Sequence, residues 1–279
     1  MDESKKAGVI GWPINHSRSP LIHGYWLKKY VLSGSYEAIS LSPDELGSFF
    51  RNFAENGYSG VNVTIPHKEL VIPHLDTIDE AAKAIGAVNT IWLEDDKLQG
   101  TNTDWLGFLG NLDAGCPNWD NGAKTALVLG AGGAARGIIY ALMQRGFSQI
   151  HVANRTLERA HDMYRHFGKA VSPHALDDAD QWVAECDLIV NTTSLGMDKN
   201  PPLTLSLETI SPDCLVTDIV YAPLETPLLA QAKNKGIKCV DGLGMLLHQA
   251  APGFEKWFGA FPDVDDELRQ IILKDMGLT

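Results

Sequence analysis

A glycine-rich turn in the middle of the chain constrains the fold more than any other feature. It follows Thr125–Leu129, a continuous apolar run typical of a strand buried on both faces. A helical pattern then runs to about Arg145, and Gly146 is placed to end that helix. The turn reads Gly130-Ala131-Gly132-Gly133-Ala134-Ala135. It matches G-x-G-x-x-G/A, in which the first glycine permits the tight turn, the second permits close approach of a pyrophosphate, and the last small residue permits close helix packing.

This strand–turn–helix arrangement predicts a Rossmann-type dinucleotide site. Phosphate would lie at the helix N-terminus, where unpaired N–H groups and the helix dipole favour an anion. The alternative is a glycine-rich turn that serves packing alone. The sequence context favours the nucleotide site, because the strand before the turn and the helix after it are both present.

The end of the next strand, at residues 150–153, indicates which dinucleotide binds. Folds that prefer NAD place an acid about 20 residues after the turn, where it holds the ribose 2′-hydroxyl. Here Asn154-Arg155-Thr156 stands at the strand end, and Arg159 follows one turn later. Because an acid would repel a 2′-phosphate and arginine binds phosphate through paired hydrogen bonds, the sequence predicts NADP(H). The alternative is that both arginines are solvated residues at the start of a helix.

The composition narrows the remaining possibilities. The chain has 279 residues, 44% hydrophobic and 21% charged, which are the proportions of a globular protein with one large domain or two ordinary ones. Its net charge of −12 disfavours non-specific binding to nucleic acid or an anionic membrane. No apolar run is long enough to span a bilayer, and the N-terminal residues lack a signal-peptide apolar region. The four cysteines lack metal-site spacing, so we expect a cytoplasmic protein with reduced thiols and no metal.

Strand and helix patterns alternate along the whole chain, as they do in α/β folds. In the first third, strands are expected at residues 8–11, 36–41, 61–65 and 87–92, and helices at 20–30, 43–56 and 79–85. In the second half, strands are expected at residues 125–129, 150–153, 188–191, 216–220 and 238–240, and helices at 244–258 and 263–276. These patterns predict an α/β protein of two domains with a boundary between residues 104 and 125. The patterns alone do not decide which domain the last two helices join.

Two charged residues follow strands where ligands bind in open α/β sheets, outside the carboxyl ends of the strands. Lys68 comes after Asn62-Val63-Thr64-Ile65-Pro66-His67, and is placed to act as a cation or a proton donor. Asp104 ends Gly100-Thr101-Asn102-Thr103-Asp104 and would hold the ammonium group if the two residues meet. The alternatives are a solvated lysine and an aspartate that caps a helix.

The loop Ser17-Arg18-Ser19-Pro20 precedes the first helix. Ser19 is suited to the N-cap and Pro20 to the first helical position. Two hydroxyl groups at a helix N-terminus also form a site for a carboxylate. The sequence contains no GxSxG motif, no HExxH motif and no His/Cys cluster, so neither a hydrolase triad nor a metal site is supported.

Taken together, these motifs resemble the shikimate dehydrogenase family, and the resemblance runs nearly end to end. That family reduces 3-dehydroshikimate with NADPH in aromatic amino-acid synthesis. Besides the motifs already given, the resemblance rests on Gly86-Ala87-Val88-Asn89-Thr90, Asn191-Thr192-Thr193-Ser194-Leu195-Gly196-Met197, and Asp241-Gly242-Leu243-Gly244-Met245 with Gln249.

The resemblance implies a role for each matching residue. Lys68 is the acid/base and Asp104 stands beside it. Substrate contacts are implied for Ser17 and Ser19 at the carboxylate, and for Thr64, Asn89, Asp104, Tyr221 and Gln249 at the ring hydroxyls and carbonyl. NADP(H) contacts are implied for Glu80, Gly130, Ala131, Gly132, Gly133, Ala134, Asn154, Arg155, Thr156, Arg159, Thr193, Ile219 and Gly242.

The family fold implies an N-terminal substrate domain, residues 1–104, and a Rossmann-type NADP-binding domain, residues 105–244, with residues 245–279 returning to the first domain. The partners expected are the small-molecule substrate and cofactor, with no nucleic acid and no membrane, in a monomer or a homodimer. One departure is Trp105, where the family often has glycine. Two alternatives stay open: a quinate/shikimate dehydrogenase of broader specificity, and a non-catalytic NADPH-binding protein on the same fold.

Overall fold

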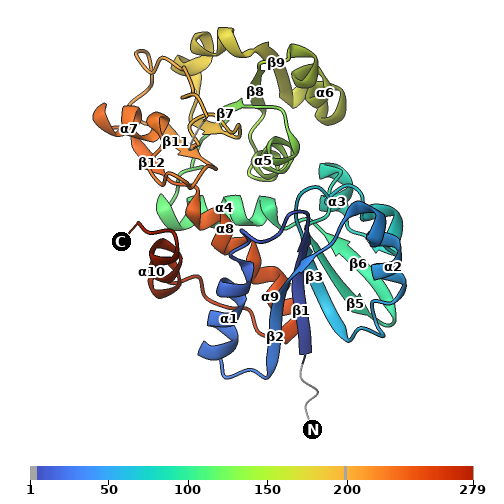
Figure 1. The fold of residues 1–279 in the computed structure, drawn as a ribbon. Coiled ribbons are helices and arrows are strands. Elements are labelled where there is room, and N and C mark those ends of the chain that lie inside the picture. The colour runs from blue at the N-terminus through green and yellow to red at the C-terminus, as the bar shows by residue number, and fades with distance from the viewer. Residues whose placement is uncertain (1–4, 198–199, 279) are drawn as a thin grey trace. The chain divides into compact units, whose positions relative to one another are not determined.

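The computed structural model describes residues 5–197 and 200–278 and divides the chain into two compact units (Figure 1). Unit 1 comprises the described residues up to Asp104 together with those from Leu247 onward. Unit 2 comprises the described residues of Trp105–Leu246. The second boundary lies two residues after the one expected from the sequence. The C-terminal helices thus share unit 1 with the N-terminal third of the chain.

Unit 1 is built on a six-stranded mixed sheet with strand order β2-β1-β3-β5-β6-β4. Strand β1 runs parallel to β2 and β3, whereas β5 is antiparallel to both β3 and β6. The strands are β1 (Lys5–Gly11), β2 (Gly34–Ser40), β3 (Tyr58–Val63), β4 (Thr77–Ile78), β5 (Thr90–Glu94) and β6 (Lys97–Thr101). The helices are α1 (Ser19–Lys29), α2 (Leu46–Arg51), α3 (Glu80–Ile85), α9 (Ala250–Phe258) and α10 (Asp266–Asp275).

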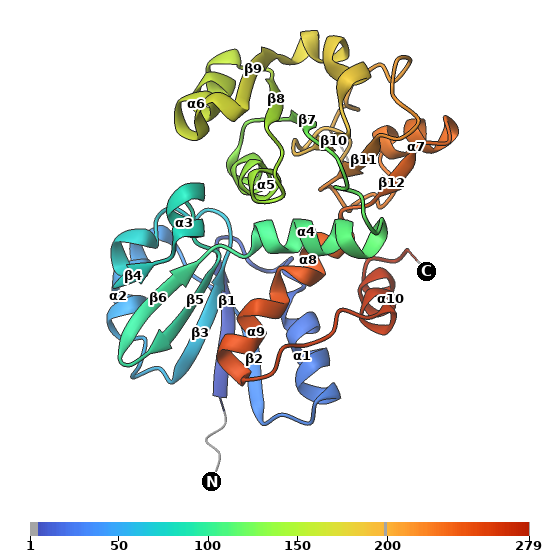
Figure 2. The ribbon, with the colours of Figure 1, turned by 180° about the vertical axis from the view of Figure 1, so that it is seen from behind.

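Alternation along β3 separates the two faces of this sheet. Val61 and Val63 belong to an apolar cluster with Phe50 and Phe53, from α2 and the turn after it. Alternation places Asn62, between the two valines, on the opposite face. Helices α1 and α9 pack on that face (Figure 2). This strand has the period of two that is typical of sheets.

An aromatic core lies between α1, β2 and α9 in unit 1. The His23 ring stacks on Tyr36 with ring centroids 4.0 Å apart, and it also contacts Trp26, Phe254 and Trp257. Burial is complete at His23 and lowers its pKa from 6.5 to about 3. The imidazole is therefore neutral at physiological pH, because a buried charge without a counter-charge is strongly disfavoured.

This buried imidazole predicts a loss of stability in acid. Below pH 6.5 the unfolded chain takes up a proton that folded His23 accepts only near pH 3, so the free energy of unfolding falls as the pH falls. Between pH 7 and pH 5 this single group lowers it by about 2 kcal/mol. The His23→Phe variant keeps the stacked ring but cannot take up a proton. In urea unfolding, its free energy of unfolding should therefore fall by about 2 kcal/mol less than that of the unmodified protein between pH 7 and pH 5. Replacing half-exposed His161 with phenylalanine provides the control; an equal change in both variants would contradict the prediction.

Unit 2 is built on a six-stranded, fully parallel sheet with strand order β12-β11-β10-β7-β8-β9. This is the strand order of a Rossmann sheet: the first three strands are added toward one edge, and the next three are added on the other side of the first strand, β7. The strands are β7 (Thr125–Leu129), β8 (Gln149–Asn154), β9 (Val171–Ala175), β10 (Leu188–Asn191), β11 (Leu215–Asp218) and β12 (Lys238–Val240). The helices are α5 (Gly133–Gln144), α6 (Leu157–Phe167) and α7 (Pro227–Asn234), together with most of α4 (Asp104–Gly115) and α8 (Leu243–His248), whose first residue and last two residues respectively belong to unit 1.

Both faces of the unit 2 sheet are covered. Ala126 and Val128 of β7 join the cluster that contains α5, whereas Leu127 and Leu129 join the cluster that contains α7. All four residues have no exposed surface. The continuous apolar run in the sequence thus reflects a strand with helices on both sides.

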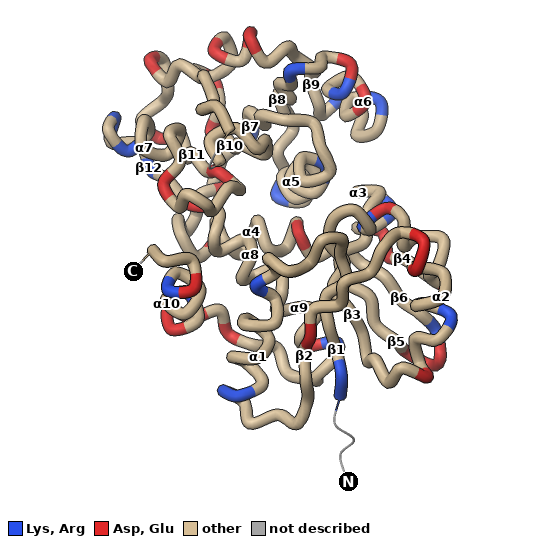
Figure 3. Tube along the Cα trace, viewed as in Figure 1, with Lys and Arg blue, Asp and Glu red and all other residues tan. Residues whose placement is uncertain are grey.

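Membrane-spanning helices and metal-ligand clusters were looked for among the described residues. None of the helices they form has the length and apolar character that crossing a bilayer requires. Within residues 5–197 and 200–278, no three His, Cys, Asp or Glu side chains are grouped as metal ligands would be. All four cysteines are free, and acidic residues are spread over both units (Figure 3).

Candidate active site

The structure brings Lys68 and Asp104 together, although 35 residues separate them in the sequence. The Lys68 ammonium donates to Asp104 Oδ2 at 2.5 Å, and both side chains are mostly buried. Asn89 Nδ2 donates to the other carboxylate oxygen, Oδ1, at 2.8 Å. Lys68 follows β3, Asn89 precedes β5, and Asp104 begins α4. An ammonium group held by a carboxylate is an arrangement that can deliver a proton to a bound ligand.

Backbone groups set the orientation of these side chains. The Thr103 backbone N–H donates to Asn89 Oδ1 at 2.7 Å, so the amide nitrogen of Asn89 must face Asp104. Asn102 Oδ1 accepts the backbone N–H of Asp104 at 3.0 Å, and its Nδ2 donates to the Ala87 carbonyl. Asp104 is therefore the first residue of α4 and not its cap. These bonds hold the carboxylate in one position before any ligand arrives, as preorganised sites require.

Gln249 joins the same cluster from the C-terminal part of unit 1. Its Oε1 accepts from Asn89 Nδ2 at 3.4 Å, and its backbone carbonyl accepts from the Thr103 hydroxyl at 2.8 Å. Gln249 lies between α8 and α9. This placement explains how a residue at position 249 reaches a site formed by the first hundred residues.

The N-terminus of α1 differs from the prediction. The N-cap is Arg18, not Ser19; Ser19 is the first helical residue and Pro20 the second. Ser17 Oγ accepts the backbone N–H of Ser19 at 3.3 Å, and no side chain caps the helix. The cap prediction was wrong because Arg18 already has helical backbone angles, so the helix starts one residue earlier.

The other residues implied for the substrate lie in two different units. Thr64 directly follows β3 in unit 1, and its backbone N–H donates to the Ile10 carbonyl at 3.0 Å. Tyr221 lies in unit 2, three residues after the end of β11. Unit 1 alone therefore carries Ser17, Ser19, Thr64, Lys68, Asn89, Asp104 and Gln249.

The glycine-rich turn of unit 2 has the features a pyrophosphate needs. Gly130 has a φ of +109°, and a side chain there would meet Thr192 Oγ1 at 2.6 Å. Gly132 is the N-cap of α5 and has no side chain to bond the first N–H groups of that helix. Added Cβ atoms at Gly132 and Gly133 would lie in open space. The helix N-terminus is thus accessible to an anion, with Ala131 and Ala134 alongside.

The arginines predicted to bind a 2′-phosphate lie at the carboxyl end of the neighbouring strand. Asn154 ends β8, Thr156 is the N-cap of α6, and both Arg155 and Arg159 are exposed. Asn154 Nδ2 donates to the Thr156 carbonyl at 2.8 Å and shapes this turn. The one acid of the first turn of α6, Glu158, pairs with Arg165 at 2.7 Å.

A buried polar network joins the carboxyl ends of β10 and β11. Its central residue, Asp218, was not predicted from the sequence. Asp218 accepts hydrogen bonds from Asn191 Nδ2, the Val220 backbone N–H and the Thr226 hydroxyl at 2.8–3.1 Å. Burial raises the pKa of Asp218, and these hydrogen bonds partly offset that effect. Asn191 Oδ1 in turn accepts from the backbone N–H and hydroxyl of Thr193.

Three of the residues implied for the cofactor are placed by this network or beside it. Thr193 is held by Asn191, and Ile219 donates its backbone N–H to the Asn191 carbonyl at 3.1 Å. Gly242 lies so close to β11 that a side chain would meet the Asp218 and Ile219 carbonyl oxygens at 2.6 Å. Glu80 is different, because it begins α3 in unit 1 and is exposed.

Trp105 also has a partner in unit 2. Its ring meets Tyr140 of α5 edge to face, with centroids 5.3 Å apart. The bulky residue thus packs on the helix that follows the glycine-rich turn.

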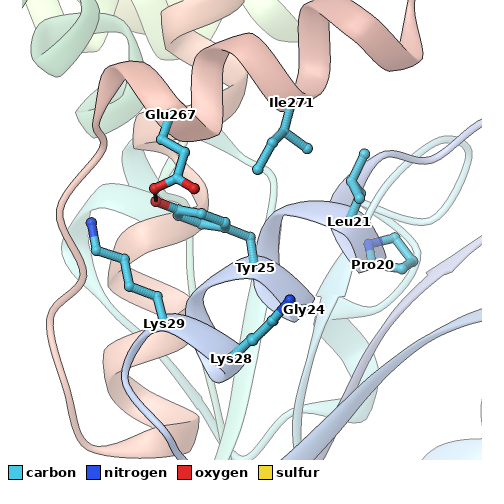
Figure 4. A pocket seen from close by; sticks show the side chains of 8 residues that line it. All are labelled: Pro20, Leu21, Gly24, Tyr25, Lys28, Lys29, Glu267 and Ile271. Atoms are coloured by element: carbon cyan, nitrogen blue, oxygen red, sulfur yellow. Dashed lines mark hydrogen bonds between the residues drawn. The ribbon is translucent and has the colours of Figure 1, made fainter.

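A separate groove of about 500 Å³ lies in unit 1 between α1 and α10 (Figure 4). Leu21 and Ile271 project into it, while Lys28 and Lys29 line its rim. The Tyr25 hydroxyl donates to Glu267 across the groove at 3.0 Å. None of the predicted substrate or cofactor residues lines this groove.

Comparisons with known proteins find relatives along nearly the whole chain. Three family models match: "shikimate dehydrogenase substrate binding domain" at residues 9–91, "shikimate / quinate 5-dehydrogenase" at 118–198, and "shikimate 5′-dehydrogenase C-terminal domain" at 242–266. A shikimate dehydrogenase (NADP(+)) of Azorhizobium caulinodans is 52% identical over 272 residues, which are 98% of this chain and 97% of that protein.

Solved structures give the same result. Shikimate dehydrogenase of Thermus thermophilus, in complex with NADP(H) and shikimate, has a TM-score of 0.80 and 38% identity, over 93% of this chain and 95% of that one. Quinate dehydrogenase of Corynebacterium glutamicum, in complex with NAD, has a TM-score of 0.88 and 31% identity, over 97% and 99%. On the strength of these matches along nearly its whole length, the chain belongs to the shikimate dehydrogenase family.

Proposed function

We propose that this chain catalyses the reversible, NADPH-dependent reduction of 3-dehydroshikimate to shikimate. The observation that carries the proposal is the Lys68–Asp104–Asn89 cluster, an oriented proton donor in a chain that is 52% identical to an NADP-dependent shikimate dehydrogenase. The proposal assigns substrate binding mainly to unit 1 and NADP(H) binding to unit 2. Monomer or homodimer stays a prediction, as does the absence of a nucleic-acid partner.

In this mechanism NADPH supplies the hydride that adds to the carbonyl carbon at C3. Negative charge then develops on the carbonyl oxygen, where the Lys68 ammonium stabilises it and donates a proton. Asp104 holds the ammonium in position, and Asn89 holds Asp104. In the reverse direction neutral Lys68 would accept the proton from the C3 hydroxyl, and the hydride from that carbon would return to NADP⁺.

Polar side chains around the reacting centre supply specificity. In the proposal Ser17 and Ser19 hold the carboxylate, while Thr64, Asn89, Tyr221 and Gln249 hold hydroxyl groups. A site built from hydrogen-bonding groups rejects analogues that lack a hydroxyl, because its buried polar atoms would be left unpaired. The unit 2 turn with Gly130 and Gly132 would hold the pyrophosphate, and Asn154, Arg155 and Arg159 would hold the 2′-phosphate.

The test is the absorbance change of NADPH formation, measured with shikimate or quinate and with NADP⁺ or NAD⁺. Shikimate-dependent formation of NADPH would support the proposal. Comparable turnover of quinate would favour the broader dehydrogenase. Tight NADP⁺ binding without turnover of either substrate would favour the non-catalytic alternative.

The hydrogen bonds of Asp218 predict that its replacement weakens NADP⁺ binding. Replacing it with alanine leaves the Asn191, Thr226 and Val220 donors without their acceptor, each costing about 1–3 kcal/mol of stability when unpaired. Because Asn191 holds Thr193, the KM for NADP⁺ should rise about tenfold, with a smaller change for shikimate. Asp187→Ala is the matched control: Asp187 accepts from the backbone of Lys124 and Thr125 at the start of β7. The prediction is wrong if both variants change the KM for NADP⁺ alike.

A further inference from the structure

His67 lies directly before Lys68, in a segment that belongs to no helix or strand. Residues 64–71 form turns between β3 and the 3₁₀ turn Ile72–His74. Within residues 64–71 only His67 and Val71 are buried, and His67 has no exposed surface. The proton donor of the proposed mechanism is therefore carried by a loop, and its buried neighbour is the side chain best placed to hold that loop.

The His67 imidazole connects two strands that are not neighbours. In the unit 1 sheet, β1 lies between β2 and β3. His67 follows β3, whereas Leu41, whose carbonyl oxygen lies 2.7 Å from His67 Nε2, directly follows β2. Leu41 is itself fixed, because its backbone N–H donates to the Gly11 carbonyl at 3.2 Å and its side chain is buried in the core. The ring thus joins the carboxyl ends of β3 and β2 across the end of β1.

The Leu41 carbonyl determines which ring nitrogen of His67 carries the proton. A carbonyl oxygen can only accept, so Nε2 must be the donor, and Nδ1 is an acceptor in the neutral ring. Nδ1 is buried and has no hydrogen-bond partner among the residues that the structure describes. A buried polar atom without a partner lowers stability, and an apolar ring at this position would contain no such atom. What the imidazole provides in return is the bond to Leu41.

The backbone of Lys68 is tied to the other half of the catalytic cluster. Its carbonyl accepts the Val88 N–H at 2.8 Å. Val88 directly precedes Asn89, which orients Asp104, the partner of the Lys68 ammonium. The base of the lysine side chain is therefore restrained from both sides, by the ring of His67 before it and by the chain that carries Asn89.

From these contacts, and resting on the proposed function, we propose that His67 is a positioning residue for Lys68. Its bond to Leu41 holds the loop so that the ammonium group meets the carbonyl oxygen of the bound substrate. The ring itself touches neither substrate nor cofactor in this proposal, because it is fully buried within unit 1. Catalysis depends on such placement, since a displacement of about 1 Å can lower a rate about 10²-fold. Loss of the bond should therefore appear in kcat.

The test measures steady-state oxidation of shikimate by NADP⁺ in His67→Phe, His67→Gln and His67→Asn. The glutamine amide nitrogen lies the same number of bonds from Cβ as Nε2 and can restore the bond to Leu41, whereas the asparagine nitrogen corresponds to Nδ1 and cannot. His67→Phe and His67→Asn should lower kcat about tenfold or more and change the KM for shikimate and for NADP⁺ little, while His67→Gln recovers most of kcat. His74→Phe is the matched control, since it keeps the ring that stacks on Phe50, and it should keep kcat.

A double variant tests whether His67 acts through Lys68. In the Lys68→Met background, which lacks the proton donor, adding His67→Phe should lower kcat little further. A merely structural role would instead lower kcat by the same factor in both backgrounds, and that result would overturn the inference.

The remaining outcomes separate this inference from the proposed function. An unchanged kcat in His67→Phe, or equal kcat values in His67→Gln and His67→Asn, would overturn the role of His67 and leave the proposed function intact. Absence of shikimate oxidation by the unmodified protein would overturn the proposed function itself. If His67→Phe does not fold, the comparison of His67→Gln with His67→Asn decides, because these two variants differ only in where the amide nitrogen lies.

Discussion

Replacing Lys68 with methionine is expected to lower kcat for shikimate oxidation by about 10²–10⁴. Methionine fills much of the same volume but carries neither the charge nor the proton. The substitution removes the group that stabilises negative charge on the C3 oxygen and exchanges its proton. It also leaves the Asp104 carboxylate, 19% exposed and bonded to Asn89, without its counter-charge.

This prediction is tested by measuring the catalytic rate and the binding of NADP⁺ separately. Steady-state rates should show the loss in kcat, whereas binding of NADP⁺ measured by calorimetry should not change, because Lys68 lies in unit 1 and the glycine-rich turn in unit 2. Lys83→Met, at an exposed position on α3, serves as the control and should keep full activity. A Lys68→Met variant with more than a tenth of the original kcat would remove lysine from the acid/base role.

The sequence predicted well those parts of the fold in which local pattern and tertiary packing agree. The apolar run at β7, the glycines after it and the helix to residue 144 appear where the sequence indicated. Strands β4, β6 and β9 were not predicted. β4 has only two residues, and β9 contains Pro173 and His174, so neither has an apolar period; both lie at sheet edges, where one side is not covered by a strand.

The expected helix at residues 43–56 is also shorter than its apolar period suggests. It contains a 3₁₀ turn at Pro43–Glu45 and helix α2 at Leu46–Arg51, and then gives way to a turn that ends at Gly57 with a φ of +74°. Phe53 lies in that turn and still packs into the core. Periodicity reports which side chains are buried, and a turn at the edge of a core can bury a side chain as well as a helix can.

The candidate site was predicted less completely than the fold, because the spacing of residues along the sequence does not give the distances between their side chains. Motif positions pointed to Lys68 and Asp104, but the contact between them depends on the pairing of β3, β5 and β6, which brings Asn89 beside Thr103 and Asp104. Of the residues that hold other residues, Asp104 was predicted but Asp218 was missed. Asp218 holds Asn191, which lies 27 residues away in the sequence, and only the folded structure shows that bond.

Replacing Arg155 and Arg159 together with alanine is expected to raise the KM for NADP⁺ by about 10²–10⁴. Each guanidinium–phosphate bond contributes about 1.5–3 kcal/mol, and each 1.4 kcal/mol is tenfold in affinity. The KM for NAD⁺ should change little, because NAD⁺ has no 2′-phosphate for these side chains to hold. The preference for NADP⁺ should therefore collapse, while kcat at saturating NADP⁺ stays close to its original value, since neither arginine is placed at the reacting atoms.

The control for this pair lies on α6, the helix that carries Arg159 and begins two residues after Arg155. Arg165 of α6 is also exposed but is engaged by Glu158 and Asp162, so Arg165→Ala removes one positive charge, as each single arginine substitution does, without removing a phosphate ligand. If simple attraction between the cofactor and a positive surface set the affinity, all three arginines would matter alike, and added salt would weaken NADP⁺ binding to each variant equally. If Arg155 and Arg159 hold the 2′-phosphate, the Arg165 variant keeps the original ratio of NADP⁺ to NAD⁺ efficiency and the double variant loses it. Equal ratios in the double variant and the unmodified protein would mean that the turn after β8 does not select the cofactor, and the choice would have to be made elsewhere in unit 2.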